Sequence, residues 1–130
     1  MQTITILLIE DHKEIRQSTA EILRGAGYSV IEALDGVEGL LRLSAEAIDV
    51  ILLDVGLPRL DGATLLQTQY NPPPVIVVSA LEYFSEEVLQ ARFGSKVFAF
   101  LQKPVAPERL LAVVADAIAG SAGRGSLDSG

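Results

Sequence analysis

The length of 130 residues predicts a single domain that is large enough to bury a substantial core. The net charge of −7 argues against nucleic-acid binding through phosphate neutralisation, and the absence of cysteine excludes disulfides and thiolate metal sites. Because no apolar run approaches the ~18 residues of a membrane span and the N-terminus lacks a basic region, we expect a cytoplasmic globular domain without membrane contact.

Five apolar runs of strand length recur along the chain, and they cover residues 4–9, 28–33, 50–53, 75–78 and 97–101. A helical pattern follows each run. These patterns cover residues 13–24, a segment that begins at residues 35–36, a short segment after residue 62, residues 85–94, and a last segment from about residue 107. Strand and helix therefore alternate five times.

Glycine and proline mark the ends of several predicted helices. Gly25 and Gly27 predict a left-handed cap at the end of the first helix, and the prolines at positions 72–74 must end the third. Residues 120–130 hold four glycines and three serines, which is typical of a flexible tail. We therefore expect a domain of residues 1–119 followed by a flexible segment.

The predicted strands are continuous apolar runs, which is typical of strands that are buried on both faces. Together with the alternating helices, they predict an α/β fold with a doubly wound, five-stranded parallel sheet flanked by five helices. Right-handed crossovers leave few possible strand orders.

Polar residues that can carry chemistry stand at four of the predicted strand ends: Glu10, Asp11, Asp54, Ser79 and Lys103. Because the carboxyl ends of parallel strands meet at one edge, we expect these side chains to gather there. Three adjacent carboxylates would titrate as a coupled set with raised pKa values, and they suit Mg²⁺, which prefers oxygen ligands. A lysine and a hydroxyl beside them would bind phosphoryl oxygens.

Each candidate also has a structural alternative. Asp54 could simply end its strand, and Asp11 with Glu14 fits a capping box that opens the first helix. Ser79 could be a small polar strand end, and Lys103 an ordinary surface lysine. The single histidine, His12, is interpreted as a capping or solvent-facing residue, and Asp61-Gly62 as a turn and helix start.

The ordered set of motifs resembles the CheY-like receiver domains of two-component response regulators. The matching pieces are Ile9-Glu10-Asp11, Leu52-Leu53-Asp54, Leu57-Pro58-x-x-Asp61-Gly62, Val78-Ser79-Ala80 and Lys103-Pro104. The resemblance covers about residues 3–119. It implies a flavodoxin-like sheet with the strand order 2-1-3-4-5.

The resemblance implies that Asp54 accepts a phosphoryl group from a sensor histidine kinase or a phosphotransfer protein. It also implies that Glu10, Asp11, Asp54 and the backbone carbonyl of Gly56 hold Mg²⁺. The domain would then be a phosphoacceptor in signal transduction or a phosphorelay, and not an enzyme with a substrate of its own.

Three further roles follow from the same resemblance. Lys103 would pair with the phosphoryl oxygens, Ser79 would hydrogen-bond one of them, and Phe100 would be the switch aromatic. A cis peptide bond is expected between Lys103 and Pro104. The switch would act on a homodimer or effector through the face formed by the fourth helix, fifth strand and fifth helix.

The chain departs from the family pattern in two places. It has fewer residues between Asp54 and Ser79, which predicts a third helix about one turn short. It has slightly more between Ser79 and Lys103, which leaves open the register of the fourth helix and the position of Phe100.

Other functions remain as alternatives. A phosphorylation-independent scaffold with the receiver fold is one. A phosphohydrolase that forms an aspartyl phosphate is a weaker one, because such enzymes typically place the nucleophile after the first strand in an Asp-x-Asp arrangement. Flavodoxin-like cofactor binding is disfavoured, because the acidic loop that begins at Glu10 lacks a phosphate cradle.

Overall fold

The structure, a computed structural model, describes residues 3–55, 73–79, 87 and 97–129. The strands are β1 (Thr5–Ile9), β2 (Ser29–Ala33), β3 (Val50–Val55), β4 (Val75–Ser79) and β5 (Val97–Gln102). The helices are α1 (Lys13–Gly25), α2 (Gly36–Ala45) and α5 (Pro107–Ser129). The two helices predicted after residue 62 and over residues 85–94, including the expected shortening of the first, lie outside the described residues.

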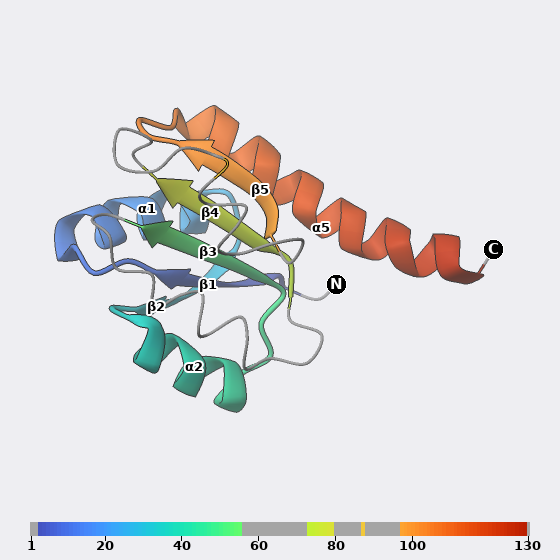
Figure 1. The fold of residues 1–130 in the computed structure, drawn as a ribbon, viewed down its shortest axis with the longest axis horizontal. Helices are drawn as coiled ribbons and strands as arrows, with labels where there is room; N and C mark the ends of the chain where they lie inside the picture. Colours follow the sequence, from blue (N-terminus) through green and yellow to red (C-terminus); the bar gives the residue numbers. More distant parts are fainter. Residues whose placement is uncertain (1–2, 56–72, 80–86, 88–96, 130) are drawn as a thin grey trace.

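The five strands form one sheet in the order β2-β1-β3-β4-β5, and all neighbouring strands are parallel (Figure 1). This arrangement confirms the predicted doubly wound fold and its strand order. Because all five strands run in the same direction, their carboxyl ends lie at the same edge of the sheet.

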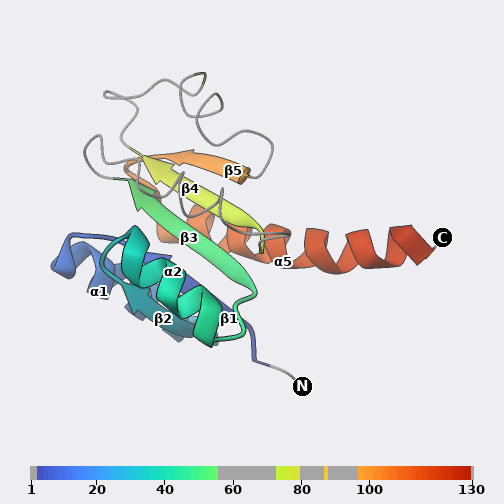
Figure 2. The same ribbon diagram turned by 60° about the horizontal axis from the view of Figure 1, so that its bottom comes forward.

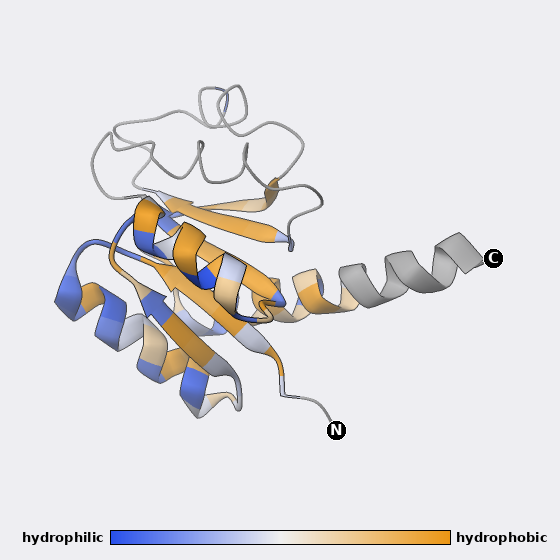
Figure 3. Cartoon of the chain, turned by 90° about the horizontal axis from the view of Figure 1, so that it is seen from below, coloured by the Kyte–Doolittle hydropathy of each residue, from blue (hydrophilic) through white to orange (hydrophobic). Residues whose placement is uncertain are grey.

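Helices cover both faces of the sheet, as the continuous apolar strands require. Helices α1 and α5 lie on one face, and α2 lies on the other (Figure 2). The sheet therefore separates two buried apolar clusters, and the hydropathy colouring shows apolar strands behind α2 and an α1 with several hydrophilic residues (Figure 3). This burial is the main stabilising term of the fold.

Helix α1 begins after His12, whose Nδ1 accepts a hydrogen bond from the Ile15 backbone N–H at 3.3 Å. The capping interpretation of His12 is confirmed. The alternative in which Asp11 and Glu14 form the capping box is wrong, because the N-cap position belongs to the following residue. Gly27 has a φ of 97° after the helix end, as predicted for a left-handed residue in this turn.

Helix α2 begins after Asp35, whose Oδ1 accepts a hydrogen bond from the Glu38 backbone N–H at 2.8 Å. Leu40 and Leu43 pack against the sheet, whereas Leu41 is 65% exposed. The apolar side chains of this helix are therefore divided between the core and the surface.

Strand β5 contains an irregularity near its start. Val75 pairs with Val97, but the next residue of β4, Ile76, pairs with Ala99, so Phe98 is an extra residue on β5. This is the arrangement of a β-bulge. The pairing then continues to the end of both strands, where Ser79 pairs with Gln102.

Helix α5 continues to Ser129 and extends past the end of the sheet (Figure 1). Residues 120–129, which the sequence predicts to begin a flexible segment, belong to this helix. Adding residues to an established helix requires no new nucleation, although each glycine still costs about 1 kcal/mol relative to alanine. None of the helices in the described part of the chain is long and apolar enough to cross a membrane.

Two leucines on helices test the division between core and surface. Leu23 of α1 is fully buried, and Leu41 of α2 is largely exposed. We expect Leu23→Ala to lower the free energy of unfolding by about 2–5 kcal/mol through lost burial and a residual cavity. The matched variant Leu41→Ala should change it by less than about 0.5 kcal/mol. Urea unfolding followed by circular dichroism measures both, and equal losses would contradict this placement of α1.

Candidate functional site

The parallel register brings four of the predicted site residues to one edge of the sheet. Ile9 pairs with Leu53, so Glu10 and Asp54 directly follow paired residues on neighbouring strands. On the other side of β3, the Lys103 backbone N–H donates to the Ser79 carbonyl at 2.8 Å. The edge therefore joins two carboxylates, a hydroxyl and an ammonium from four strands.

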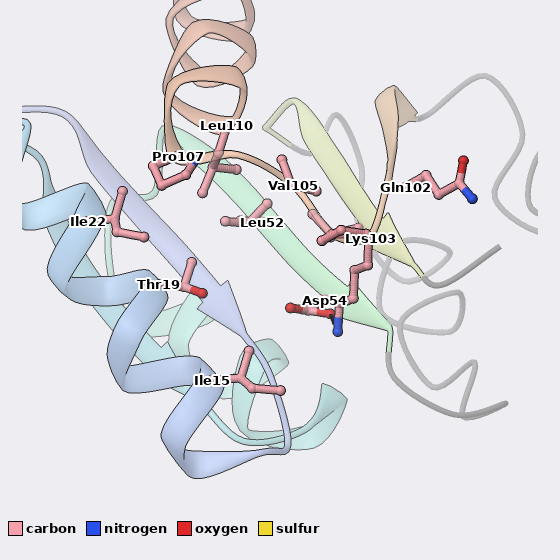
Figure 4. Close-up of a pocket in the computed structure, with 12 residues that line it drawn as sticks. Ile15, Thr19, Ile22, Leu52, Asp54, Gln102, Lys103, Val105, Pro107 and Leu110 are labelled. Atoms are coloured by element: carbon pink, nitrogen blue, oxygen red, sulfur yellow. Dashed lines mark ion pairs between the residues drawn. The ribbon is translucent and has the colours of Figure 1, made fainter. Parts of the chain in front are cut away.

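Asp54 and Lys103 form the main ion pair of this edge. Lys103 Nζ lies 2.6 Å from Asp54 Oδ1, and the Lys103 side chain reaches toward the carboxylate across the ends of the strands (Figure 4). The Asp54 side chain is 8% exposed, so the pair is shielded from most of the solvent. Oδ1 makes no aligned hydrogen bond with any described residue, and its close contact is therefore ionic.

Glu10 is buried at the end of β1, with 2% of its surface exposed. Its Oε1 accepts a hydrogen bond from the His12 backbone N–H at 2.9 Å, and its Oε2 has no hydrogen-bond partner among the described residues. Burial, together with the negative charge of the neighbouring Asp54 carboxylate, raises the pKa of Glu10 to about 8. A protonated Glu10 can donate to that carboxylate, whereas an ionised one repels it.

Ser79 is fully buried, and its Oγ has no hydrogen-bond partner among the residues that the structure describes. A buried hydroxyl without a partner costs about 1–3 kcal/mol. An acceptor group that binds at this edge would remove this cost by accepting a hydrogen bond from the Ser79 hydroxyl.

The remaining predicted site residues are placed less centrally. Asp11 is exposed, but its carboxylate is near enough to Glu10 to raise the pKa of that group by hydrogen bonding. Gly56 lies outside the described residues. Phe100 is half-buried and packs against the apolar cluster of β3, β4 and α2. The peptide bond between Lys103 and Pro104 is cis, as expected.

A cavity of about 610 Å³ opens beside the ion pair (Figure 4). Ile15, Thr19 and Ile22 project into it from α1, and Leu110 lines it from α5. Asp54 and Lys103 form its polar end. A ligand in this cavity would reach the carboxylate from the side of α1 and α5.

One residue that the sequence does not predict also contacts the site. Arg16, on the second turn of α1, donates through Nη1 to the Glu10 carbonyl at 2.9 Å. No spacing signal marks this contact, because it joins a helix side chain to a backbone atom six residues earlier and depends on how α1 lies on the sheet.

The donor set fits a hard divalent cation. Glu10 Oε2 and Asp54 Oδ1 are buried carboxylate oxygens without hydrogen bonds from described residues, and they belong to adjacent strands. Within the described ranges, no three acidic, histidine or cysteine side chains converge in one metal-binding group. Mg²⁺ is bound through one or two carboxylates and several waters, so this smaller set suffices.

The chain matches the family described as Response regulator receiver domain over residues 6–115. It is 36% identical over 113 residues to the response regulator MprA of Mycobacterium tuberculosis (strain H37Rv), a match that covers 85% of this chain and 48% of that protein. It is 37% identical over 110 residues to MprA of Mycobacterium avium (strain 104), covering 82% and 47%. The chain thus spans about half the length of the curated relatives it matches.

Solved structures show the same architecture. A CheY-like receiver domain protein from Methanospirillum hungatei JF-1 superposes with a TM-score of 0.84 and 28% identity, covering 95% of this chain and 99% of that one. The chemotaxis protein CheY4 of Vibrio cholerae superposes with a TM-score of 0.75 and 28% identity, covering 89% and 99%.

The raised pKa of Glu10 predicts a pH-dependent stability in the absence of divalent cations. Between the ordinary pKa of 4.5 in the unfolded chain and the pKa of about 8 in the folded chain, the folded chain binds more protons than the unfolded chain. The stability that Glu10 adds is therefore present below the lower value and is lost as pH rises through the higher one.

We expect the free energy of unfolding of the wild type, relative to Glu10→Gln, to fall as pH rises from about 5 to about 8 in the presence of a chelator. Urea unfolding at several pH values measures this difference, because titrations elsewhere are common to both proteins. A difference that stays constant over this range would contradict the assignment.

Proposed function

The chain belongs to the family of response regulator receiver domains of two-component systems, and from this premise we propose that Asp54 is its phosphoacceptor. In this proposal a sensor histidine kinase or a phosphotransfer protein donates the phosphoryl group in a Mg²⁺-dependent reaction. The phosphorylated domain then changes its contacts with a partner.

One observation carries the proposal. The Asp54–Lys103 ion pair lies between two buried oxygen atoms without hydrogen-bond partners from the described residues, Glu10 Oε2 and Ser79 Oγ. A phosphoryl group on Asp54 would give the hydroxyl an acceptor and Lys103 additional anionic oxygens. The polar groups at this edge thus have more hydrogen-bond and ionic partners with the phosphoryl group attached than without it.

The covalent step follows from the chemistry of the carboxylate. An Asp54 oxygen forms a bond to phosphorus while the P–N bond of the donor's phosphohistidine breaks, and the imidazole leaves with the electron pair. The product is an aspartyl phosphate, a mixed anhydride that water can hydrolyse. Lys103, which pairs with Asp54, would then offset the charge of the transferred group.

The cation would be held by Glu10, Asp54, Asp11 and the Gly56 carbonyl. Mg²⁺, when bound, supplies positive charge that stabilises the negative oxygens during transfer. Glu10 must release its proton before it can act as a ligand, because metal binding requires the ionised carboxylate.

We assign the readout of phosphorylation to Ser79 and Phe100. Movement of the Ser79 side chain toward a phosphoryl oxygen would leave space next to β5, and the Phe100 side chain on that strand would move into this space. The responding face would include β5 and α5, where a second copy or an effector would bind. The acidic charge favours a protein partner over direct nucleic-acid binding, and we place the domain in the cytoplasm.

Phosphorylation of Asp54 is tested with acetyl phosphate and Mg²⁺, with the mass of the intact protein as the measurement. We expect the wild type to gain one phosphoryl group and Asp54→Asn to gain none. The matched control is Asp49→Asn, because Asp49 precedes the same strand at its other end and accepts a hydrogen bond from the Thr5 N–H. This control should be modified like the wild type.

Beryllofluoride binding, followed by ¹⁹F NMR, provides a second measurement of the same site. An unmodified wild type that also fails to bind beryllofluoride would overturn the proposal and favour the phosphorylation-independent scaffold. Repeated turnover of phosphate monoesters would instead favour a phosphohydrolase.

Ser79→Ala separates the role of the hydroxyl from the stability of the fold. Because Ser79 Oγ has no partner among the described residues, its removal should leave the free energy of unfolding unchanged or raise it by about 1 kcal/mol. A hydrogen bond to a charged group contributes about 1.5–3 kcal/mol, so beryllofluoride affinity should fall at least about tenfold. Urea unfolding and ¹⁹F NMR titration give the two quantities, and an unchanged affinity would remove Ser79 from the site.

A further inference from the structure

The backbone of Glu10 is held from both sides. Its N–H donates to the Ala33 carbonyl of β2 at 3.0 Å, and its C=O accepts from Arg16 Nη1 at 2.9 Å. The His12 N–H holds Oε1 of its side chain at 2.9 Å. Its Oε2 accepts no hydrogen bond from an N–H or O–H donor of the described residues.

Arg16 is itself fixed by a second contact. Its Nε lies 3.3 Å from Glu32 Oε1 of β2, and its side chain is only 15% exposed. The other oxygen of Glu32 pairs with Arg24 Nη2 at 3.2 Å, and the same Nη2 donates to the Val30 carbonyl at 3.0 Å. The planar guanidinium of Arg16 therefore joins a carboxylate on β2 to the carbonyl of Glu10 in one rigid bridge.

We infer that Arg16 is a positioning residue that fixes the direction of the Glu10 carboxylate toward the cation site. This inference rests on the proposed function, because it takes Glu10 as a ligand of Mg²⁺. The ion demands near-ideal octahedral geometry at about 2.0–2.1 Å, so a small rotation of the Glu10 peptide weakens binding. Outer contacts of this kind typically change metal affinity 10- to 100-fold when they are removed.

The two arginines on α1 provide a matched comparison. Both pair with Glu32 and both tie α1 to β2, but only Arg16 contacts the backbone of Glu10. A purely structural role would therefore be shared by Arg16 and Arg24. A positioning role belongs to Arg16 alone.

The test is Mg²⁺ binding measured by isothermal titration calorimetry on the full chain, without a phosphodonor and at constant pH and ionic strength. We expect Arg16→Gln to weaken Mg²⁺ binding about tenfold and Arg24→Gln to change it less than about twofold. Arg16→Lys keeps the charge but cannot span Glu32 and the Glu10 carbonyl together, so it should resemble Arg16→Gln. Thermal unfolding in a chelator records the structural effect of each variant separately.

The outcomes distinguish the inference from the function on which it rests. Equal losses of affinity in the two glutamine variants, or wild-type affinity in Arg16→Lys, would overturn the positioning role and leave the proposed site intact. A wild type that binds no Mg²⁺ would overturn both. If Arg16→Gln does not fold, Glu32→Gln releases the guanidinium from β2, and severalfold weaker Mg²⁺ binding is then the expected result, with wild-type affinity contradicting it.

Discussion

The carboxyl ends of β1, β3, β4 and β5 stop at one edge of the sheet, and this alignment decides the ionic state of the site. Strands β1, β3 and β4 are buried along nearly their whole length, so a side chain that follows their last apolar residue stays largely inside the protein. Glu10 and Asp54 are placed together where burial disfavours two negative charges. Lys103 pairs with Asp54 at 2.6 Å, and Glu10 responds to the remaining imbalance through its raised pKa. In the absence of a cation, Glu10 therefore holds a proton at the position where the proposed function needs a cation.

The bulge in β5 leaves the pairing at the polar edge of the sheet regular. Phe98 is the extra residue on β5 relative to β4. The bulge lies at the start of the strand, far from the polar edge, and regular pairing follows it. Lys103 consequently keeps its backbone hydrogen bond to Ser79 and its ion pair with Asp54.

Strands and strand ends could be predicted because they depend on local signals: an apolar run long enough to cross the sheet and the polar residue that stops it. The gathering of Glu10 and Asp54 followed from parallel pairing alone. Contacts made by long side chains could not be predicted in this way. Whether Asp11 or His12 caps α1 depends on which residue has the extended backbone, and both types can accept a hydrogen bond there. The Arg16 bridge depends further on the angle at which α1 packs against β2.

Charge balance connects the resting and the proposed phosphorylated forms. When Glu10 is ionised, its carboxylate and those of Asp11 and Asp54 outnumber the single positive charge on Lys103, so the bare edge has an excess negative charge. A divalent cation would offset this excess. An aspartyl phosphate replaces the single charge of Asp54 by about −1.5 to −2, and this added negative charge increases the need for the cation. Since an unbalanced charge is most costly where water is excluded, the buried edge favours the phosphoryl group together with the cation over the phosphoryl group alone. The burial that raises the pKa of Glu10 thus also makes cation binding and attachment of the phosphoryl group favour each other.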